Sequence, residues 1–264
     1  MSLSPQPDVQ SIHDQIPTIA LKIKPLVKNT PLLHSAYYSD LTGANVFFKY
    51  ENLQTTGSFK IRGASAKLIG TPKETLEDGI VTASTGNHGK AVAFAAQSLG
   101  VTSTIYAPTG TDPFKIAAIT KLGGKLVFAG SDCVETELLA IEHADKNKAT
   151  YVAPYNDPEV IAGQGTLGLE ISNQLGSVDA VFLSVGGGGL AAGVGAYLKT
   201  EIPGCQIIGC SPENSCVMIK SLQAGELLPL PSTETLSDGT AGGVEPGSIT
   251  FPLCQTILDQ CCTV

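Results

Sequence analysis

One lysine stands in a sequence context that suits chemistry better than it suits a surface charge. Lys60 follows Gly57 and Ser58, which are typical of a helix start, because glycine frees the backbone and serine caps the first N–H groups. Lys60 is therefore expected in the first helical turn, where the positive end of the helix dipole disfavours a protonated amine. A neutral amine there can act as a nucleophile or form an imine. Taken alone, the pattern also fits a solvated lysine.

Four consecutive glycines form the second candidate for chemistry. Gly186, Gly187, Gly188 and Gly189 follow an apolar stretch, residues 178–185, that predicts a buried strand, and a helix is expected after them. Such a turn lets several backbone N–H groups point at one anion, with help from the helix dipole. A plain tight turn needs only one or two glycines. The spacing of these glycines matches neither the phosphate-binding loop of nucleotide-binding proteins nor the glycine pattern of dinucleotide-binding folds. A phosphate monoester is therefore the expected anion, with nucleotide binding as the weaker alternative.

A third stretch, residues 84–89, is a strand-to-helix turn rich in hydrogen-bond donors. Its backbone N–H groups, with the hydroxyls of Ser84 and Thr85, could hold a carboxylate. Asn87 both donates and accepts, which suits a phenolic oxygen. An ordinary helix cap, with Ser84 or Thr85 capping and His88 in the first turn, stays open as the alternative.

An imine-forming lysine, a phosphate cradle and a carboxylate cradle together match pyridoxal phosphate. That cofactor has an aldehyde, a phosphate and a phenolic oxygen, and its usual substrates carry an α-carboxylate. The stretches resemble the pyridoxal-phosphate-dependent threonine and serine dehydratases and serine racemase, and more distantly cysteine synthase and the β subunit of tryptophan synthase. The resemblance covers nearly the whole chain and is most specific at residues 58–63, 82–89, 162–166 and 186–189.

The resemblance implies a role for each matching residue. Lys60 would bind the cofactor aldehyde and then take the α-proton of the substrate, with Thr85 as the second catalytic group. The remaining cofactor contacts would come from Phe59 beside the pyridine ring, Asn87 at the phenolic oxygen, and Gly186, Gly187, Gly188 and Gly189 at the phosphate. The substrate carboxylate would be held by Ser84, Thr85, Gly86, Asn87 and His88. The activity implied is β-elimination of a small β-hydroxy amino acid, such as L-threonine or L-serine, to a 2-oxo acid and ammonia.

Departures from the family pattern leave alternatives open. Thr85 stands where racemases carry serine and dehydratases often carry alanine, so a serine or aspartate-type racemase is the alternative activity. The stretch 153–157 differs from both groups, which leaves room for a bulkier or acidic substrate. Ser211 stands where serine racemase-like members place an acidic metal ligand, and no metal site is predicted.

The C-terminal end is a further departure. Family members continue to a serine or cysteine that meets the pyridine nitrogen, whereas this sequence ends at Val264. We therefore expect a chain that is short at its C-terminus. This expectation keeps open an alternative of another class, a truncated, non-catalytic member that binds an anion or a partner.

Strand and helix patterns alternate with short connections, and the strands are apolar. This predicts an α/β fold of two lobes, each an open twisted, mostly parallel sheet flanked by helices, with the cofactor between them. Residues 50–150 are expected to form the small lobe. Residues 1–49 and 151–264 are expected to form the large lobe, without its C-terminal part.

Composition limits the partners and the compartment. The net charge of −8, with no basic run, speaks against nucleic acid. No apolar stretch approaches the roughly 20 residues that span a membrane, and the N-terminus lacks an apolar signal segment. Seven cysteines without Cys-x-x-Cys spacing favour reduced thiols in the cytoplasm. The expected partners are an amino-acid substrate and, because dimers are usual among relatives, a second copy of the chain.

Overall fold

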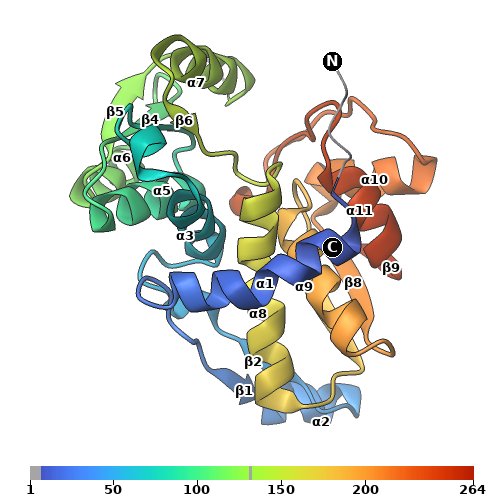
Figure 1. The fold of residues 1–264 in the computed structure, drawn as a ribbon. Helices are drawn as coiled ribbons and strands as arrows, with labels where there is room; N and C mark the ends of the chain where they lie inside the picture. The colour runs from blue at the N-terminus through green and yellow to red at the C-terminus, as the bar shows by residue number, and fades with distance from the viewer. Residues whose placement is uncertain (1–6, 131–132) are drawn as a thin grey trace.

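The computed structural model describes residues 7–130 and 133–264, which build two parallel sheets flanked by helices. The first sheet has the strand order β5-β4-β3-β6, and the second has the order β7-β8-β9. Figure 1 shows the two sheets on opposite sides of the long helix α8 (Pro158–Leu175). The predicted α/β class, with parallel sheets and flanking helices, is confirmed. Residues 1–6, whose polarity argued against a signal segment, lie outside the described residues.

The first sheet is covered on both faces. Its strands are β3 (Ile80–Ala83), β4 (Ser103–Ala107), β5 (Lys125–Phe128) and β6 (Thr150–Tyr151). Its helices are α3 (Lys60–Gly70), α4 (Lys73–Leu76), α5 (Asn87–Ser98), α6 (Pro113–Lys121) and α7 (Cys133–Asn147). Ile80 packs with buried residues of α3 and α5, whereas its neighbour Val81 packs with Ala140 and Ala144 of α7. Successive strand residues point to opposite faces, so both faces of β3 are buried.

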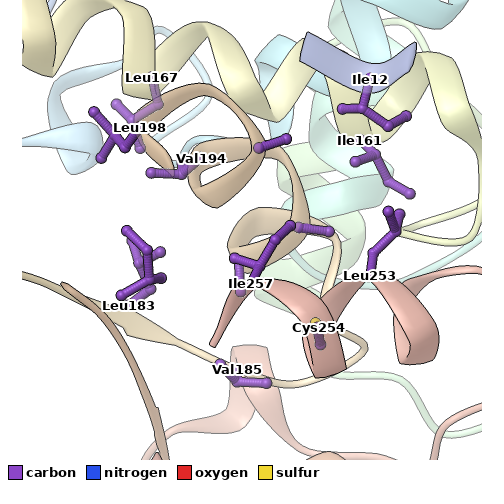
Figure 2. Packing of buried hydrophobic residues seen from close by; sticks show 14 of the residues in the cluster. Ile12, Ile161, Leu167, Leu183, Val185, Val194, Leu198, Leu253, Cys254 and Ile257 are labelled. Atoms are coloured by element: carbon purple, nitrogen blue, oxygen red, sulfur yellow. The ribbon is translucent and has the colours of Figure 1, made fainter. Parts of the chain in front are cut away.

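The second sheet packs against a larger helical layer. Its strands are β7 (Ala180–Ser184), β8 (Gln206–Ser211) and β9 (Gln260–Thr263). The layer contains α8 together with α1 (Val9–Ile23), α9 (Gly189–Glu201), α10 (Val217–Ala224) and α11 (Thr250–Ile257). Figure 2 shows Ile12 of α1 beside Ile161 of α8, and Leu253 and Ile257 of α11 below α9. These residues form one continuous apolar core.

Two sequence expectations are corrected. The strand before the four glycines is not buried on both faces: Ala180, Phe182 and Ser184 share one face of β7 and are all exposed, Phe182 by 68%. Ser58 does not cap α3: the N-cap is Phe59, which makes no side-chain capping bond. α1 also runs without a break through Pro17.

A small antiparallel unit was not anticipated as a whole. It comprises β1 (Leu32–His34), α2 (Ala36–Thr42) and β2 (Phe47–Lys49), with β1 and β2 paired antiparallel. Short 3-10 turns complete the chain at Glu51–Leu53, Glu213–Ser215 and Asp238–Thr240. Within the described residues, the helices are all too short or too polar to traverse a lipid bilayer.

Candidate active site

Lys60 is the first residue of α3, as the sequence predicts, and its amine is withdrawn from water. The side chain is half-buried, and its Nζ donates a hydrogen bond of 2.7 Å to the carbonyl oxygen of Pro154. Desolvation lowers the pKa of Lys60 from 10.5 to about 8. Roughly a tenth of the amine is therefore unprotonated at pH 7, far more than for an ordinary lysine, and the free amine is the form that nucleophilic and base chemistry require.

The segment that receives the Lys60 hydrogen bond also packs against the four-glycine turn. A Cβ placed on Gly187 would lie 2.4 Å from Cδ1 of Tyr155, and one on Gly189 would lie 2.9 Å from Cβ of Tyr155. The hydroxyl of Tyr155 accepts a hydrogen bond of 3.0 Å from the backbone N–H of Glu245. Pro154 and Tyr155 are neighbours in the chain, so one short segment contacts both Lys60 and the glycine turn.

The glycine turn is closely packed and has no room for side chains. Gly188 has φ +86, and its Cβ would lie 2.9 Å from Sγ of Cys254, while a Cβ on Gly186 would lie 2.7 Å from the carbonyl oxygen of Thr240. The hydroxyl of Thr250 donates to the carbonyl of Gly187 at 2.6 Å. Among the described residues, the backbone N–H groups of residues 186–188 donate to no protein acceptor. Unused donors at the start of α9 fit the phosphate of the implied cofactor.

The turn before α5 also keeps its donors free. The N-cap of α5 is Gly86, without a side-chain capping bond, so neither Ser84 nor Thr85 is an ordinary cap. The Oγ of Ser84 accepts instead from the Gly86 N–H at 3.3 Å. No backbone acceptor within the described chain receives the N–H groups of residues 85, 87 and 88. This turn therefore has the donor set that a carboxylate needs.

His88 is a buried, neutral side chain close to Lys60. Its Nε2 lies 3.0 Å from the carbonyl oxygen of Val152, so Nε2 carries the proton and Nδ1 is an acceptor. Burial and the charge of Lys60 lower the pKa of His88 to about 3. The Nδ1 atom is buried without a protein partner, as is Oγ of Ser58. Orphaned buried polar atoms are uncommon, so these two atoms fit a site that a ligand completes.

Two further predicted residues line the same region. Phe59 precedes Lys60, whose Nζ lies 5.6 Å from the centre of the phenyl ring. Asn87 is exposed, and its Nδ2 would lie 3.7 Å from a Cβ on Gly239. In the described chain, no hydrogen bond joins Thr85 to Lys60. The catalytic and binding roles assigned to these residues stay predictions.

A buried ion-pair network follows Lys60 directly and was not predicted from sequence. Arg62 is fully buried, and its guanidinium donates to Glu51 (2.8 and 2.8 Å) and to Glu170 (2.8 and 2.9 Å). Lys49 donates to the same Glu170 carboxylate at 2.6 Å. Burial opposes ionisation of Glu51, but the hydrogen bonds and charge of Arg62 leave its pKa below the usual range. The network ties the first turn of α3 to α8 and so positions Lys60.

The position expected for a metal ligand is occupied by an uncharged, buried side chain. The hydroxyl of Ser211 donates to the carbonyl of Val185 at 2.6 Å. In residues 7–130 and 133–264, no three histidine, cysteine, aspartate or glutamate side chains gather closely enough to bind a metal ion.

A lysine amine at a helix start, a glycine turn with unused N–H groups and a donor-rich turn fit the class of proteins that bind a phosphorylated cofactor through a lysine. Residues 23–264 match the pyridoxal-phosphate-dependent enzymes, and the chain belongs to that family. Pyridoxal phosphate is the cofactor of the family, and the lysine and the free N–H groups fit it.

Two similar relatives are both L-threonine ammonia-lyases. The chain is 39% identical over 239 residues to the L-threonine ammonia-lyase of Geobacter sulfurreducens, and 41% identical over 238 residues to that of Thermotoga maritima. Both matches cover 90% of this chain but 59% of the relative, so the chain spans well under two thirds of either one.

Solved structures agree on the fold. The processed form of threonine deaminase isoform 2 from Solanum lycopersicum superimposes with a TM-score of 0.91 at 34% identity, covering 100% of this chain and 75% of that one. Maize serine racemase gives a TM-score of 0.92 at 31% identity, covering 98% and 77% of the two chains.

Proposed function

We propose that the protein is a pyridoxal-phosphate-dependent ammonia-lyase that removes the β-hydroxyl of L-threonine or L-serine and releases a 2-oxo acid and ammonia. The observation that carries this proposal is the environment of Lys60. Its amine has a pKa of about 8 and is held by the segment that packs against the glycine turn. The names of the relatives in both comparisons support the same chemistry.

The proposed mechanism assigns separate tasks to the two turns and to Lys60. When bound, pyridoxal phosphate supplies an electron sink for the charge that develops on the substrate α-carbon. The free N–H groups of residues 186–188 would hold its phosphate, and Phe59 would pack beside its ring. Lys60 would attach the cofactor and, as a free amine, take the α-proton at Nζ.

The turn at residues 84–88 would orient the substrate. Its free N–H groups would bind the α-carboxylate, and Asn87 would reach the phenolic oxygen of the cofactor. Because His88 stays neutral, it adds no positive charge beside Lys60. This preserves the balance between the protonated and free forms of the lysine amine. Thr85 is the candidate for proton transfer on the other face, which is the group that a racemase would also need.

Incubation with candidate substrates tests this proposal. The chain, loaded with pyridoxal phosphate, is given L-serine, L-threonine or 3-hydroxyaspartate while 2-oxo acid and both enantiomers are followed. We expect 2-oxo acid to form faster than the D-enantiomer appears. Lys60→Ala should lose the activity, and the exposed control Lys73→Ala should keep it. Formation of the D-enantiomer alone would replace the lyase by a racemase. A chain that binds cofactor but converts none of these substrates would point to a non-catalytic member.

Assembly, compartment and domain division belong to the same proposal. A homodimer is proposed from the family. A cytoplasmic location is supported by the six described cysteines, which are all free. Residues 50–150 are proposed as one lobe, and residues 1–49 with 151–264 as the other, supported by the separate apolar cores around the two sheets.

A further inference from the structure

The unit formed by β1, α2 and β2 lacks a core of its own. None of the residues 31–50 is buried, although they form one helix and two paired strands. Figure 1 shows this unit at the lower end of the molecule, beyond the end of α8. It is held at its base by Lys49, which donates to Glu170 and to the carbonyl of Thr30. An isolated two-stranded hairpin is marginal in water, so the rest of the unit calls for a further packing surface.

Large apolar side chains gather on one side of this unit. Tyr38 makes edge contacts with Tyr37 and Phe48, with ring centroids 5.1 and 5.4 Å apart. Leu33 is paired with Phe48 across the two strands, and Leu41 lies one helical turn after Tyr37. We call these five residues the hairpin face. Their exposed fractions are 53% for Leu33, 72% for Tyr37, 45% for Tyr38, 68% for Leu41 and 41% for Phe48.

The size of the hairpin face suits a protein interface. A large apolar side chain has a surface of about 150–250 Å². With the exposed fractions given above, the five side chains together expose roughly 500 Å². That is the size of the largest patch on a typical monomer, and such patches are often functional. Standard interfaces bury about 800 Å² per partner, and their rim is polar. The hairpin face therefore supplies most of the apolar centre that a stable dimer needs.

The near absence of charge on the hairpin face indicates which kind of partner it fits. Residues 32–48 contain no lysine or arginine, and Asp40 is their one acidic residue. Nucleic acid and anionic membranes are recognised through cations, which this surface lacks. An uncharged aromatic surface is compatible with its own copy, because a two-fold axis would bring apolar groups together without like-charge repulsion.

We propose that the hairpin face is the contact between two copies of this chain. The inference rests on the proposed homodimer and is independent of the lyase activity. Burial of the five side chains against their symmetry mates would give α2, β1 and β2 the core that a single copy does not provide.

The test compares variants on and off the face. In Tyr37→Glu/Leu41→Glu, two exposed helix positions gain charge, so folding of one copy should survive, and circular dichroism checks this. Leu138→Glu on α7 is the matched control, because Leu138 is 63% exposed on the other lobe. The mass of each protein is measured by sedimentation over a wide concentration range. We expect dimers for the unmodified chain and the control. For the double variant we expect a dimer dissociation constant at least about 30-fold larger than that of the control, which is the effect of losing one interface hot spot.

The outcomes separate the two claims. A folded double variant that dimerises as tightly as the control would overturn the hairpin face while leaving the homodimer intact. An unmodified chain that stays a monomer at every concentration would overturn both. Loss of lyase activity with an unchanged dimer would bear on the proposed function alone. Should the double variant unfold, Tyr37→Arg, a single change at the most exposed of the five positions, repeats the comparison.

Discussion

The Nζ of Lys60 lies 2.7 Å from the carbonyl oxygen of Pro154, and this contact links α3 to the chain segment that packs on the glycine turn. Lys60 starts α3 beside the first sheet, whereas the next residue after Pro154, Tyr155, packs on Gly187 and Gly189 at the start of α9. A small molecule bound to the lysine could therefore reach the glycine turn along the segment that links them. This geometry underlies the predictions below.

The first prediction concerns the dependence of stability on pH. In the folded chain the pKa of Lys60 is about 8, against an ordinary value of 10.5. The unfolded chain thus binds more protons between these values, and the free energy of unfolding should rise with pH through that window. Lys60→Met should lack this contribution, which is roughly 3 kcal/mol. Urea unfolding of cofactor-free protein on both sides of the window measures the difference. Parallel pH profiles for the two proteins would show that the amine is not desolvated.

The second prediction concerns the glycine turn. Gly188→Ala places a side chain at φ +86 and 2.9 Å from Sγ of Cys254, so we expect a loss of about 1–3 kcal/mol in stability and weaker cofactor binding. Gly204→Ala is the matched control, because its Cβ would meet nothing within 4 Å and its φ is ordinary. Thermal unfolding and cofactor titration report the two effects. Equal behaviour of the two variants would mean that the turn is not a tight cradle.

The third prediction concerns the network around Arg62. Arg62→Met leaves the carboxylates of Glu51 and Glu170 buried without their partner, and breaking such a network costs about 3–5 kcal/mol. Arg62→Lys should also destabilise, because an ammonium cannot make the paired contacts of a guanidinium. The comparison variant Lys199→Met breaks the partly exposed pair with Asp259 and should cost about 0–1 kcal/mol. Chemical denaturation measures these losses in the free energy of unfolding. A small loss for Arg62→Met would show that the network does not hold Lys60 in place.

Local features of the fold were predictable because they depend on neighbouring residues. The four glycines follow strand β7 and lead into helix α9, and Lys60 begins a helix, both as expected. These features follow from apolar runs, glycine turns and helix starts, which can be recognised within a short stretch of sequence.

Long-range pairings were not predictable, because nothing in a single sequence reports them. Glu170 lies 108 residues after Arg62 in the chain, so their contact depends on how α3 meets α8. The same holds for Tyr155, which was noted only as part of an unusual stretch and not as a contact of the glycine turn. The exposure of Phe182 was equally unpredictable, since an apolar run does not reveal that one face of β7 is left uncovered.

The absorbance of the purified chain with pyridoxal phosphate tests the central claim most directly, since a cofactor bound covalently to a lysine has a visible band that the free cofactor lacks. We predict this band for the unmodified chain and for the exposed control Lys73→Ala, and its loss in Lys60→Ala. A chain that stays colourless with added cofactor, or a Lys60→Ala variant that keeps the band, would contradict the account.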